Sequence, residues 1–269
     1  MRTQEKHATR FRSIQTSLLF VIVPAVIISM AVLSLMGYLS SKAIIQTSAG
    51  NEMSQCLSVA MGSIEMSLSN NRMVAETMAR GVEAVQRQAV KGEQTASDWD
   101  AAAYQEILTS FVGSNPETFG GGIWFEPYQY RPEQRYFSPY CMRQNGAVTY
   151  VDNYSLGEGV YYTDQDWYTN AANTTQKSVW SAPYYDEFAQ ISMVTSSAPI
   201  YDETGRLLGV ATADIDLTQM QQMVLSLDVV ANGRAFLIDD TGVYIADEDS
   251  EKLLSANILE DDNPSFAAL

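Results

Sequence analysis

The sequence predicts an α+β protein in which two consecutive N-terminal helical segments precede a mainly antiparallel sheet with flanking helices. Three observations lead to this prediction. A long charge-free run lies near the N-terminus, and an amphipathic helical stripe without proline follows it. Short β-rich runs separated by turn residues fill most of the remaining chain. Because turns rather than helices join these runs, the strands are expected to pair antiparallel.

The charge-free run, Leu18–Leu39, has 22 residues and spans about 33 Å as a helix, which matches a hydrocarbon core of about 30 Å. Four basic residues precede it within residues 1–16, so the positive-inside rule places that segment in the cytoplasm. A cleaved signal peptide is the alternative, but its apolar region is normally about 7 to 15 residues long. We therefore expect a retained transmembrane helix over residues 17–40, with residues 41–269 outside the cell and the bilayer as a partner.

The second helical segment is expected from Lys42 to about Lys91, as a stalk. Its apolar stripe is interrupted from Ser67 to Asn71, which allows a kink. The stripe needs a partner, either a second subunit, which would make a homodimer, or the domain that follows. Its members are Met53, Leu57, Ala60, Ile64, Val74, Met78, Val82, Val85 and Ala89.

Ser97 is expected to cap a connecting helix over residues 98–112, so that residues 41–112 form the helical part outside the membrane. A sheet module follows over residues 113–229, with helices near Asp164–Asn173 and Thr218–Val229 and a turn at Gly120–Gly122. The expected strands are Gly122–Glu126, Gln134–Arg143, Val148–Asp152, Val179–Tyr185, Ile191–Tyr201 and Leu207–Asp216.

A second, shorter cycle starts in residues 230–269, with strands expected at Arg234–Asp239 and Val243–Ala246. The runs that begin at Tyr201 and Ile238 share a strand, an acidic turn containing Thr-Gly, and a further strand. This similarity predicts a repeated module, which residues 230–269 would contain only in part.

Composition excludes several functional classes. The formal net charge is −16, of which residues 42–269 contribute −19, so a nucleic-acid partner is not expected. A single histidine, His7, excludes histidine-based catalytic triads and most histidine-ligated metal sites. The two cysteines, Cys56 and Cys141, are too few for a disulfide scaffold or a cysteine-rich zinc site and are expected to be unpaired. No catalytic residue, metal ligand or cofactor is therefore predicted.

Several stretches resemble the double Cache (dCache) sensor ectodomain of bacterial methyl-accepting chemotaxis proteins. The resemblance implies a PAS-like sheet as the membrane-distal, ligand-binding module and the start of a second PAS-like module, in a chain truncated at its C-terminus. The same sensor also precedes histidine kinases and diguanylate cyclases, so those outputs are alternatives. The matching stretches are Gly121–Tyr128, Asp166–Tyr168, Trp180–Asp186, Ser192–Met193, Ala198–Ile200, Gly209–Leu217 and Gly233–Ala246.

In the amino-acid-binding branch of this family, the resemblance implies that an Arg two residues before the Trp of a Trp-Tyr pair binds the ligand carboxylate. That position is Gln165 here, and a neutral amide cannot form the bidentate pair that a guanidinium makes. Aromatic faces and carboxylates together favour a cation. An amine or another polar, non-anionic metabolite is therefore expected rather than an amino acid. The candidate ligand-binding residues are Tyr161, Tyr162, Gln165, Asp166, Trp167, Tyr184, Asp186 and Asp214.

Each candidate also has a purely structural interpretation. Trp167 and Tyr184 are equally compatible with the core, and Asp186 with a turn. Asp214 is the strongest candidate, because a single carboxylate within an apolar strand requires a reason. Asp216 is expected to cap the following helix. A membrane-anchored extracellular hydrolase with paired carboxylates is a weaker alternative, since the acids lie mainly in turns.

Overall fold

The computed structural model describes residues 14–89, 100–151, 161–227 and 234–260. The chain divides into two compact units, residues 1–55 and residues 56–269. The predicted cap Ser97 lies outside the described residues, and the connecting helix α2 (Ala101–Ser114) begins three residues later than expected. Asp100 caps it instead, since its side chain accepts a hydrogen bond from the backbone N–H of Ala103 at 3.0 Å.

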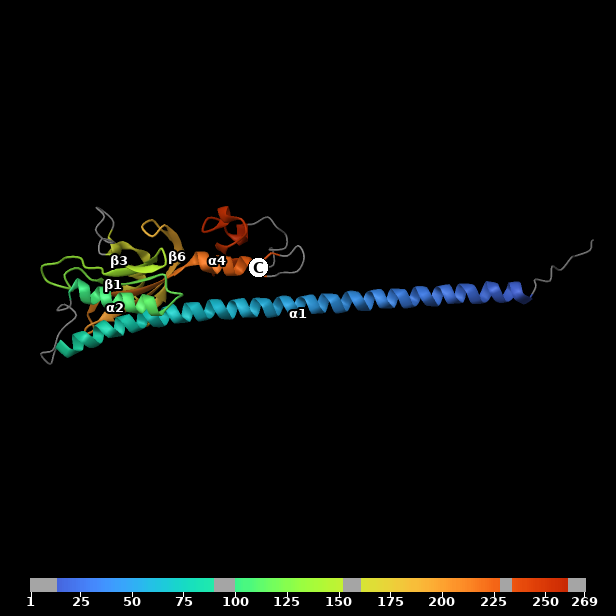
Figure 1. Ribbon diagram of the computed structural model, residues 1–269, viewed down its shortest axis with the longest axis horizontal. Helices are drawn as coiled ribbons and strands as arrows, with labels where there is room; N and C mark the ends of the chain where they lie inside the picture. The colour runs from blue at the N-terminus through green and yellow to red at the C-terminus, as the bar shows by residue number, and fades with distance from the viewer. Residues whose placement is uncertain (1–13, 90–99, 152–160, 228–233, 261–269) are drawn as a thin grey trace, which may run out of the picture. The chain divides into compact units, whose positions relative to one another are not determined.

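The first unit contains the N-terminal part of helix α1 (Ile14–Ala89). This helix is long and apolar enough by length and composition to cross a membrane, and the charge-free run is exposed along it. Pro24 lies inside α1 without ending it. The predicted transmembrane and stalk segments thus belong to one uninterrupted helix (Figure 1).

Helix α1 continues through Ser67–Asn71, where the apolar stripe is interrupted. A buried, hydrogen-bonded polar side chain, Asn71, lies at this interruption. The Asn71 amide donates to the backbone carbonyl of Ser67 at 3.0 Å, and its oxygen accepts a hydrogen bond from the Thr118 hydroxyl at 2.8 Å. Asn71 and Thr118 are both almost fully buried, so the polar group on α1 is satisfied by the segment that leads into the sheet.

The second unit is built on a seven-stranded antiparallel sheet of order β3-β2-β1-β7-β6-β4, in which β5 also pairs with β6. Figure 1 labels three of these strands. Their bounds are β1 (Gly120–Phe125), β2 (Tyr140–Gln144), β3 (Ala147–Val151), β4 (Val179–Trp180), β5 (Tyr184–Asp186), β6 (Ile191–Tyr201) and β7 (Leu207–Asp216).

The bounds of β6 and β7 are those predicted, and three other strand predictions need correction. Gly120–Gly122 is not a turn but the first half of β1, buried at the centre of the sheet. The run predicted at residues 179–185 is divided into β4 and β5 around Ala182-Pro183, because a proline cannot donate to the ladder of β6. β2 starts at Tyr140 rather than at Gln134.

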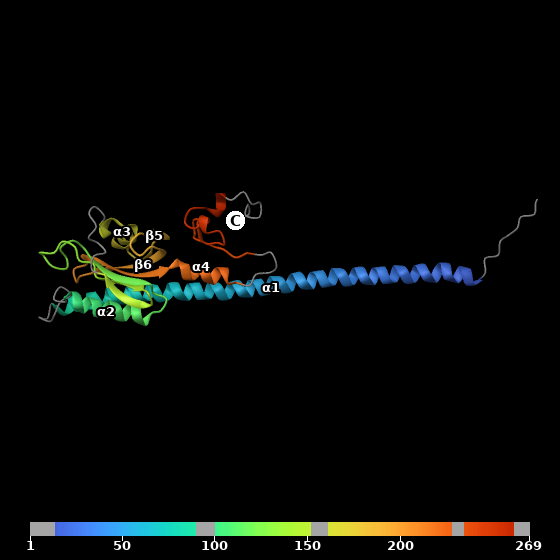
Figure 2. The ribbon, with the colours of Figure 1, turned by 45° about the horizontal axis from the view of Figure 1, so that its top comes forward.

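Helices cover both faces of the sheet. Helix α2 and the C-terminal part of α1 pack on one face, and α3 (Asp166–Ala172), preceded by the 3₁₀ turn η2 (Tyr162–Asp164), covers the other (Figure 2). Val74, Met78 and Val82 of the predicted stripe are buried in the first of these cores. The domain itself is therefore the partner of this half of the stripe.

Helix α4 (Leu217–Leu225) follows β7 directly. Asp216 caps it, as predicted, by accepting a hydrogen bond from the N–H of Thr218 at 2.8 Å. Beyond it lie the two short strands β8 (Leu237–Ile238) and β9 (Tyr244–Ala246) and the 3₁₀ turns η3 (Ser250–Lys252) and η4 (Ile258–Glu260).

The two acidic turns that look alike in sequence also share their hydrogen bonds. Asp202 Oδ1 accepts from both the N–H and the hydroxyl of Thr204, and Asp239 Oδ1 accepts from both the N–H and the hydroxyl of Thr241. The glycine that follows has a φ of +81° at Gly205 and +90° in the second turn, which favours glycine there. The repeat predicted from the sequence is thus a repeat of local geometry.

Candidate functional site

Asp214 lies near the C-terminal end of β7, between β1 and β6. Side chains alternate across a strand, and its neighbours Ala213 and Ile215 pack on the α1 side. The Asp214 side chain therefore faces the α3 side, where it is only 3% exposed. An acidic group in this position needs hydrogen-bond donors or a cation to offset its desolvation.

Hydroxyl groups supply two of these donors. The Tyr140 hydroxyl donates to Asp214 Oδ2 at 2.7 Å, and the Thr195 hydroxyl donates to Oδ1 at 2.8 Å. Tyr184 Oη lies 2.8 Å from Thr195 Oγ1. Because the Thr195 hydrogen is used towards Asp214, Tyr184 is the donor in this second contact. The four side chains form a chain of hydrogen bonds that converges on one carboxylate.

The environment changes the acidity of this carboxyl group. Burial raises the pKa of Asp214 to about 7, although the hydrogen bonds from Tyr140 and Thr195 oppose the shift. The neighbouring carboxylate of Asp186 adds a further increase. Burial, followed by the negative charge of Asp214, also raises the pKa of the Tyr184 hydroxyl. The group is thus poised to change its charge near neutral pH, and a ligand cation would favour the ionised form.

Two glycines make the contact between Tyr140 and Asp214 possible. Tyr140 pairs with Gly122 on β1, and its ring extends across β1 towards β7. A Cβ on Gly122 would lie 2.9 Å from ring carbon Cδ2 of Tyr140, and one on Gly120 would overlap its hydroxyl. Because Gly120 and Gly122 have no side chain, the Tyr140 side chain of β2 can cross β1 and reach the Asp214 side chain of β7.

Trp124 connects this polar chain to the α3 helix. Its indole N–H donates to Thr212 Oγ1 at 2.8 Å, on the same sheet face as Asp214. Its ring centroid lies 4.8 Å from that of Trp167, 5.5 Å from that of Tyr162 and 5.6 Å from that of Tyr140. Aromatic rings thus line the α3 side next to the carboxylate, an arrangement that suits an organic cation.

Among the predicted aromatic residues, Trp167 and Tyr184 both pack in the core on this face of the sheet. Tyr162 is 4% exposed, and its hydroxyl donates to the backbone carbonyl of Phe125. Tyr161 is half-buried and stacks on Tyr136 at 5.2 Å.

The remaining predicted residues lie around α3 and β5. Gln165 is the half-buried residue before α3, and its backbone N–H donates to the carbonyl of Tyr162 at 3.1 Å. Asp166 is exposed in the first turn of α3. Asp186 ends β5, where its Oδ1 accepts from the N–H of Ala189 at 2.6 Å, and its charge acts on Asp214.

Sequence reasoning missed Tyr140, Thr195 and Trp124 as members of this site. Thr195 is the cross-strand partner of Asp214, so the register of the β6–β7 hairpin contained the signal. For Tyr140 the signal was the run of three glycines at the start of β1, which was interpreted as a turn.

The described residues contain no group of three or more His, Cys, Asp or Glu side chains that could hold a metal ion. Cys56 and Cys141 are both free, and Cys141 is buried with its thiol 3.5 Å from the Thr109 hydroxyl. The cluster around Asp214 therefore consists of hydroxyl groups, aromatic rings and one carboxylate.

Comparison with known proteins identifies the segment that contains the sheet and helix α3. Residues 104–222 match the family described as "Methyl-accepting chemotaxis protein-like, first PDC sensor domain". This segment is a chemoreceptor-type PDC (Cache) sensor domain. The predicted resemblance is thereby confirmed, and the family is one of sensors.

Two chemotaxis receptors are similar to the chain in sequence. McpC of Bacillus subtilis is 38% identical over 84 residues, which cover 31% of this chain and 13% of McpC. McpA of Pseudomonas putida is 25% identical over 208 residues, which cover 75% of this chain and 31% of McpA. The chain thus spans less than a third of either receptor.

Solved sensor domains share the fold. The extracellular domain of the putative histidine kinase mmHK1S-Z2 superposes with a TM-score of 0.60 at 20% identity, covering 77% of this chain and 75% of that one. The ligand-binding domain of the amino acid chemoreceptor PctC of Pseudomonas aeruginosa, in complex with GABA, gives a TM-score of 0.54 at 19% identity, covering 78% and 80%. These likenesses establish the architecture of the sensor domain.

Proposed function

We propose that the chain is the membrane anchor and extracellular sensory region of a chemotaxis receptor, and that its sensor domain binds an organic ammonium group at Asp214. The observation that carries this proposal is the buried carboxylate, which holds two hydroxyl donors and no cation among the described residues. An ammonium ligand would supply a positive charge next to Asp214 and favour the ionised form of its carboxyl group.

The aromatic residues support the same ligand class. Trp167 and Tyr184 belong to the core on the face that Asp214 shares, and their rings attract ammonium groups through cation–π contact. Gln165 occupies the position at which a carboxylate-binding Arg would be expected, so an amine or polar uncharged metabolite fits better than an α-amino acid. Tyr161, Tyr162, Asp166 and Asp186 complete the proposed ligand set.

The proposed topology follows the distribution of charge. Residues 1–16 would be cytoplasmic, residues 17–40 would cross the membrane, and residues 41–112 would form the stalk and connecting helix. Residues 113–229 would form the membrane-distal module, and residues 230–269 would belong to a second PAS-like module. A homodimer is proposed because Leu57 on the stalk is 44% exposed and belongs to the apolar stripe.

The binding proposal is tested by calorimetry on the 269-residue chain in detergent micelles. Ethanolamine is the probe, with butyrate as an anion of similar size. We expect ethanolamine to bind, butyrate not to bind, and Asp214→Asn to weaken ethanolamine by at least about tenfold, the loss of one charge-assisted contact. Asn is preferable to Ala, because Ala would leave two buried hydroxyls without their acceptor.

Asp164→Asn is the matched control, because it removes a carboxylate that is exposed just before helix α3 and lies outside the proposed ligand set. Asp214→Asn binding ethanolamine as tightly as the unchanged chain would refute the site. Recovery of ethanolamine chemically unchanged is expected of a sensor, whereas its turnover would favour an enzyme.

A histidine kinase output is the second candidate, because the sensor domain also superposes on a putative histidine kinase ectodomain. The two candidates share the ligand site and differ in the cytoplasmic signalling domain. The coding sequence that follows residue 269 distinguishes them.

A further inference from the structure

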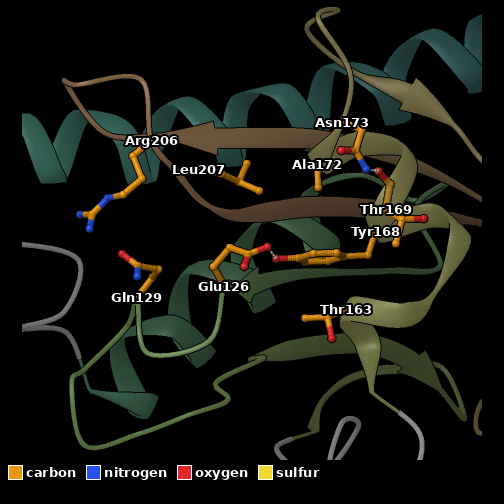
Figure 3. Close-up of a pocket in the computed structure, with 9 residues that line it drawn as sticks. All are labelled: Glu126, Gln129, Thr163, Tyr168, Thr169, Ala172, Asn173, Arg206 and Leu207. Carbon is orange, nitrogen blue, oxygen red and sulfur yellow. Dashed lines mark hydrogen bonds between the residues drawn. The ribbon is translucent and has the colours of Figure 1, made fainter.

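A hollow lies at the opposite end of β7 from Asp214. It has a volume of about 600 Å³, within the range of about 300–1,000 Å³ that is usual for small-molecule sites. The end of β1, the helix α3 and the β6–β7 hairpin surround it (Figure 3). Leu207, which lines the hollow, opens the same strand that carries Asp214 seven residues later, so the two places are separated by roughly 23 Å of extended chain.

The first wall of the hollow carries a fixed carboxylate. Glu126 follows β1, and its backbone N–H donates to the carbonyl of Leu208 at 2.9 Å. The Tyr168 hydroxyl donates to Glu126 Oε1 at 2.7 Å, a contact that Figure 3 shows. Among the described residues, Oε2 has no hydrogen-bond partner. The carboxylate is thus oriented by one donor and still has capacity for another.

The second wall carries a guanidinium whose position is also defined. Arg206 follows the acidic turn, and its Nε donates to Asp202 Oδ2 at 3.0 Å while its backbone N–H donates to Oδ1 at 3.0 Å. The side chain is 63% exposed, and in the described structure its terminal amino groups have no hydrogen-bond acceptor. They provide the planar donor pair that binds a carboxylate.

The floor between these charges suits a polar ligand with a short apolar part. The Gln129 amide and the Thr169 hydroxyl contribute donors and acceptors, and the Ala172 methyl group contributes apolar surface. Figure 3 places Arg206 at one side of the hollow and Glu126 between Arg206 and the ring of Tyr168. Separated opposite charges select a molecule with opposite charges at its two ends.

We propose that this hollow is a second binding site, which takes an extended zwitterion of the size of a dipeptide. The ligand ammonium binds Glu126 Oε2 and the ligand carboxylate binds the terminal amino groups of Arg206. The site is independent of the ammonium site at Asp214 and does not rest on the function proposed for it. Helix α3 contributes to both places, because Trp167 packs beside Trp124 and the next residue, Tyr168, lines the hollow.

The test uses the 269-residue chain in micelles with methyl-labelled alanine, observed by NMR. Diglycine is the probe, glycinamide retains only its cationic end, and N-acetylglycine retains only its anionic end. We expect diglycine to shift the Ala172 methyl signal, and each half-ligand to bind at least about tenfold more weakly, since each lacks one charge-assisted contact. Ala147, an exposed residue on β3, is the internal control and should not move.

Variants assign the charges. Glu126→Gln keeps an acceptor for Tyr168, and Arg206→Gln changes an exposed side chain, so both should fold normally. Each should weaken diglycine by about tenfold or more, whereas the matched surface variants Glu106→Gln and Arg72→Gln should leave it unchanged. Asp214→Asn should also leave it unchanged.

Two results would overturn the second site. One is an Ala172 signal that does not respond to diglycine. The other is a response that persists equally in Glu126→Gln and Arg206→Gln. Either result would leave the ethanolamine experiment at Asp214 unaffected, so failure of this proposal is distinguishable from failure of the first.

Discussion

The acidity of Asp214 predicts how the stability of the sensor domain depends on pH. Its pKa is about 7 in the folded domain and 3.8 for an ordinary aspartate, so between these values the folded state binds a proton that the unfolded state has lost. The free energy of unfolding therefore falls as pH rises from about 4 to about 7, and it is level above that range. Between these two pH values the free energy of unfolding changes by on the order of 4 kcal/mol, because each unit of pKa shift corresponds to about 1.4 kcal/mol.

Asp214→Asn removes the titrating group and keeps an oxygen as hydrogen-bond acceptor. We expect this variant to lose the component of stability that changes between pH 5 and pH 7, on the order of 3 kcal/mol, at about 1.4 kcal/mol per pH unit. The measurement is urea denaturation of the micelle-bound chain at several pH values, followed by tryptophan fluorescence. Trp124 lies in the same core as the carboxylate and reports on this region.

The control is Asp166→Asn, because that carboxylate is exposed and its removal should leave the pH dependence of the parent chain. If the parent and Asp214→Asn have the same slope of unfolding free energy against pH, the carboxylate does not retain its proton in the folded state. The argument that burial outweighs the two hydroxyl donors would then be wrong.

Three further predictions follow from the same geometry. Ethanolamine should bind up to about tenfold more weakly for each pH unit below 7, because a cation requires ionised Asp214; an unchanged Kd at pH 5.5 in calorimetry would contradict this. Gly120→Ala should displace the Tyr140 hydroxyl from Asp214 and lower the free energy of unfolding, measured by urea denaturation, by about 2–4 kcal/mol. The control Gly146→Asn, at a turn with φ +81°, should lower it by less than about 1 kcal/mol. Asn71→Ala should cost about 1–3 kcal/mol in the same assay, because the buried hydroxyl of Thr118 loses its acceptor; a loss below about 0.5 kcal/mol would show that this bond is not formed.

The elements that local patterns predict best are those whose signal lies in consecutive residues. β6 and β7 are long β-rich runs, and their hairpin turn carries an acidic residue and a glycine with positive φ, so their bounds could be predicted. Asp214 could be selected as well, because an acidic residue within an apolar run is visible in the sequence alone.

The partners of Asp214 could not be predicted in this way, because tertiary register brings them together. Tyr140 is 74 residues distant in sequence and reaches Asp214 only because β1 lies between their strands and lacks two side chains. A missing side chain leaves no polar or apolar pattern, so Gly120 and Gly122 were interpreted as a turn. The polar Asn71 at the interruption of the α1 stripe likewise has a tertiary partner, the hydroxyl of Thr118.

That contact also connects the proposed ligand site to the helix. The backbone carbonyl of Asp214 accepts a hydrogen bond from the N–H of Phe119 at 2.8 Å, and the preceding residue, Thr118, donates to Asn71 on α1. Two hydrogen bonds and one peptide unit therefore link the backbone of β7 at Asp214 to the helix. In the proposed receptor, mutation of the Asp214 carboxylate would alter sensitivity to ligand, and mutation of the Asn71 amide would alter output along α1.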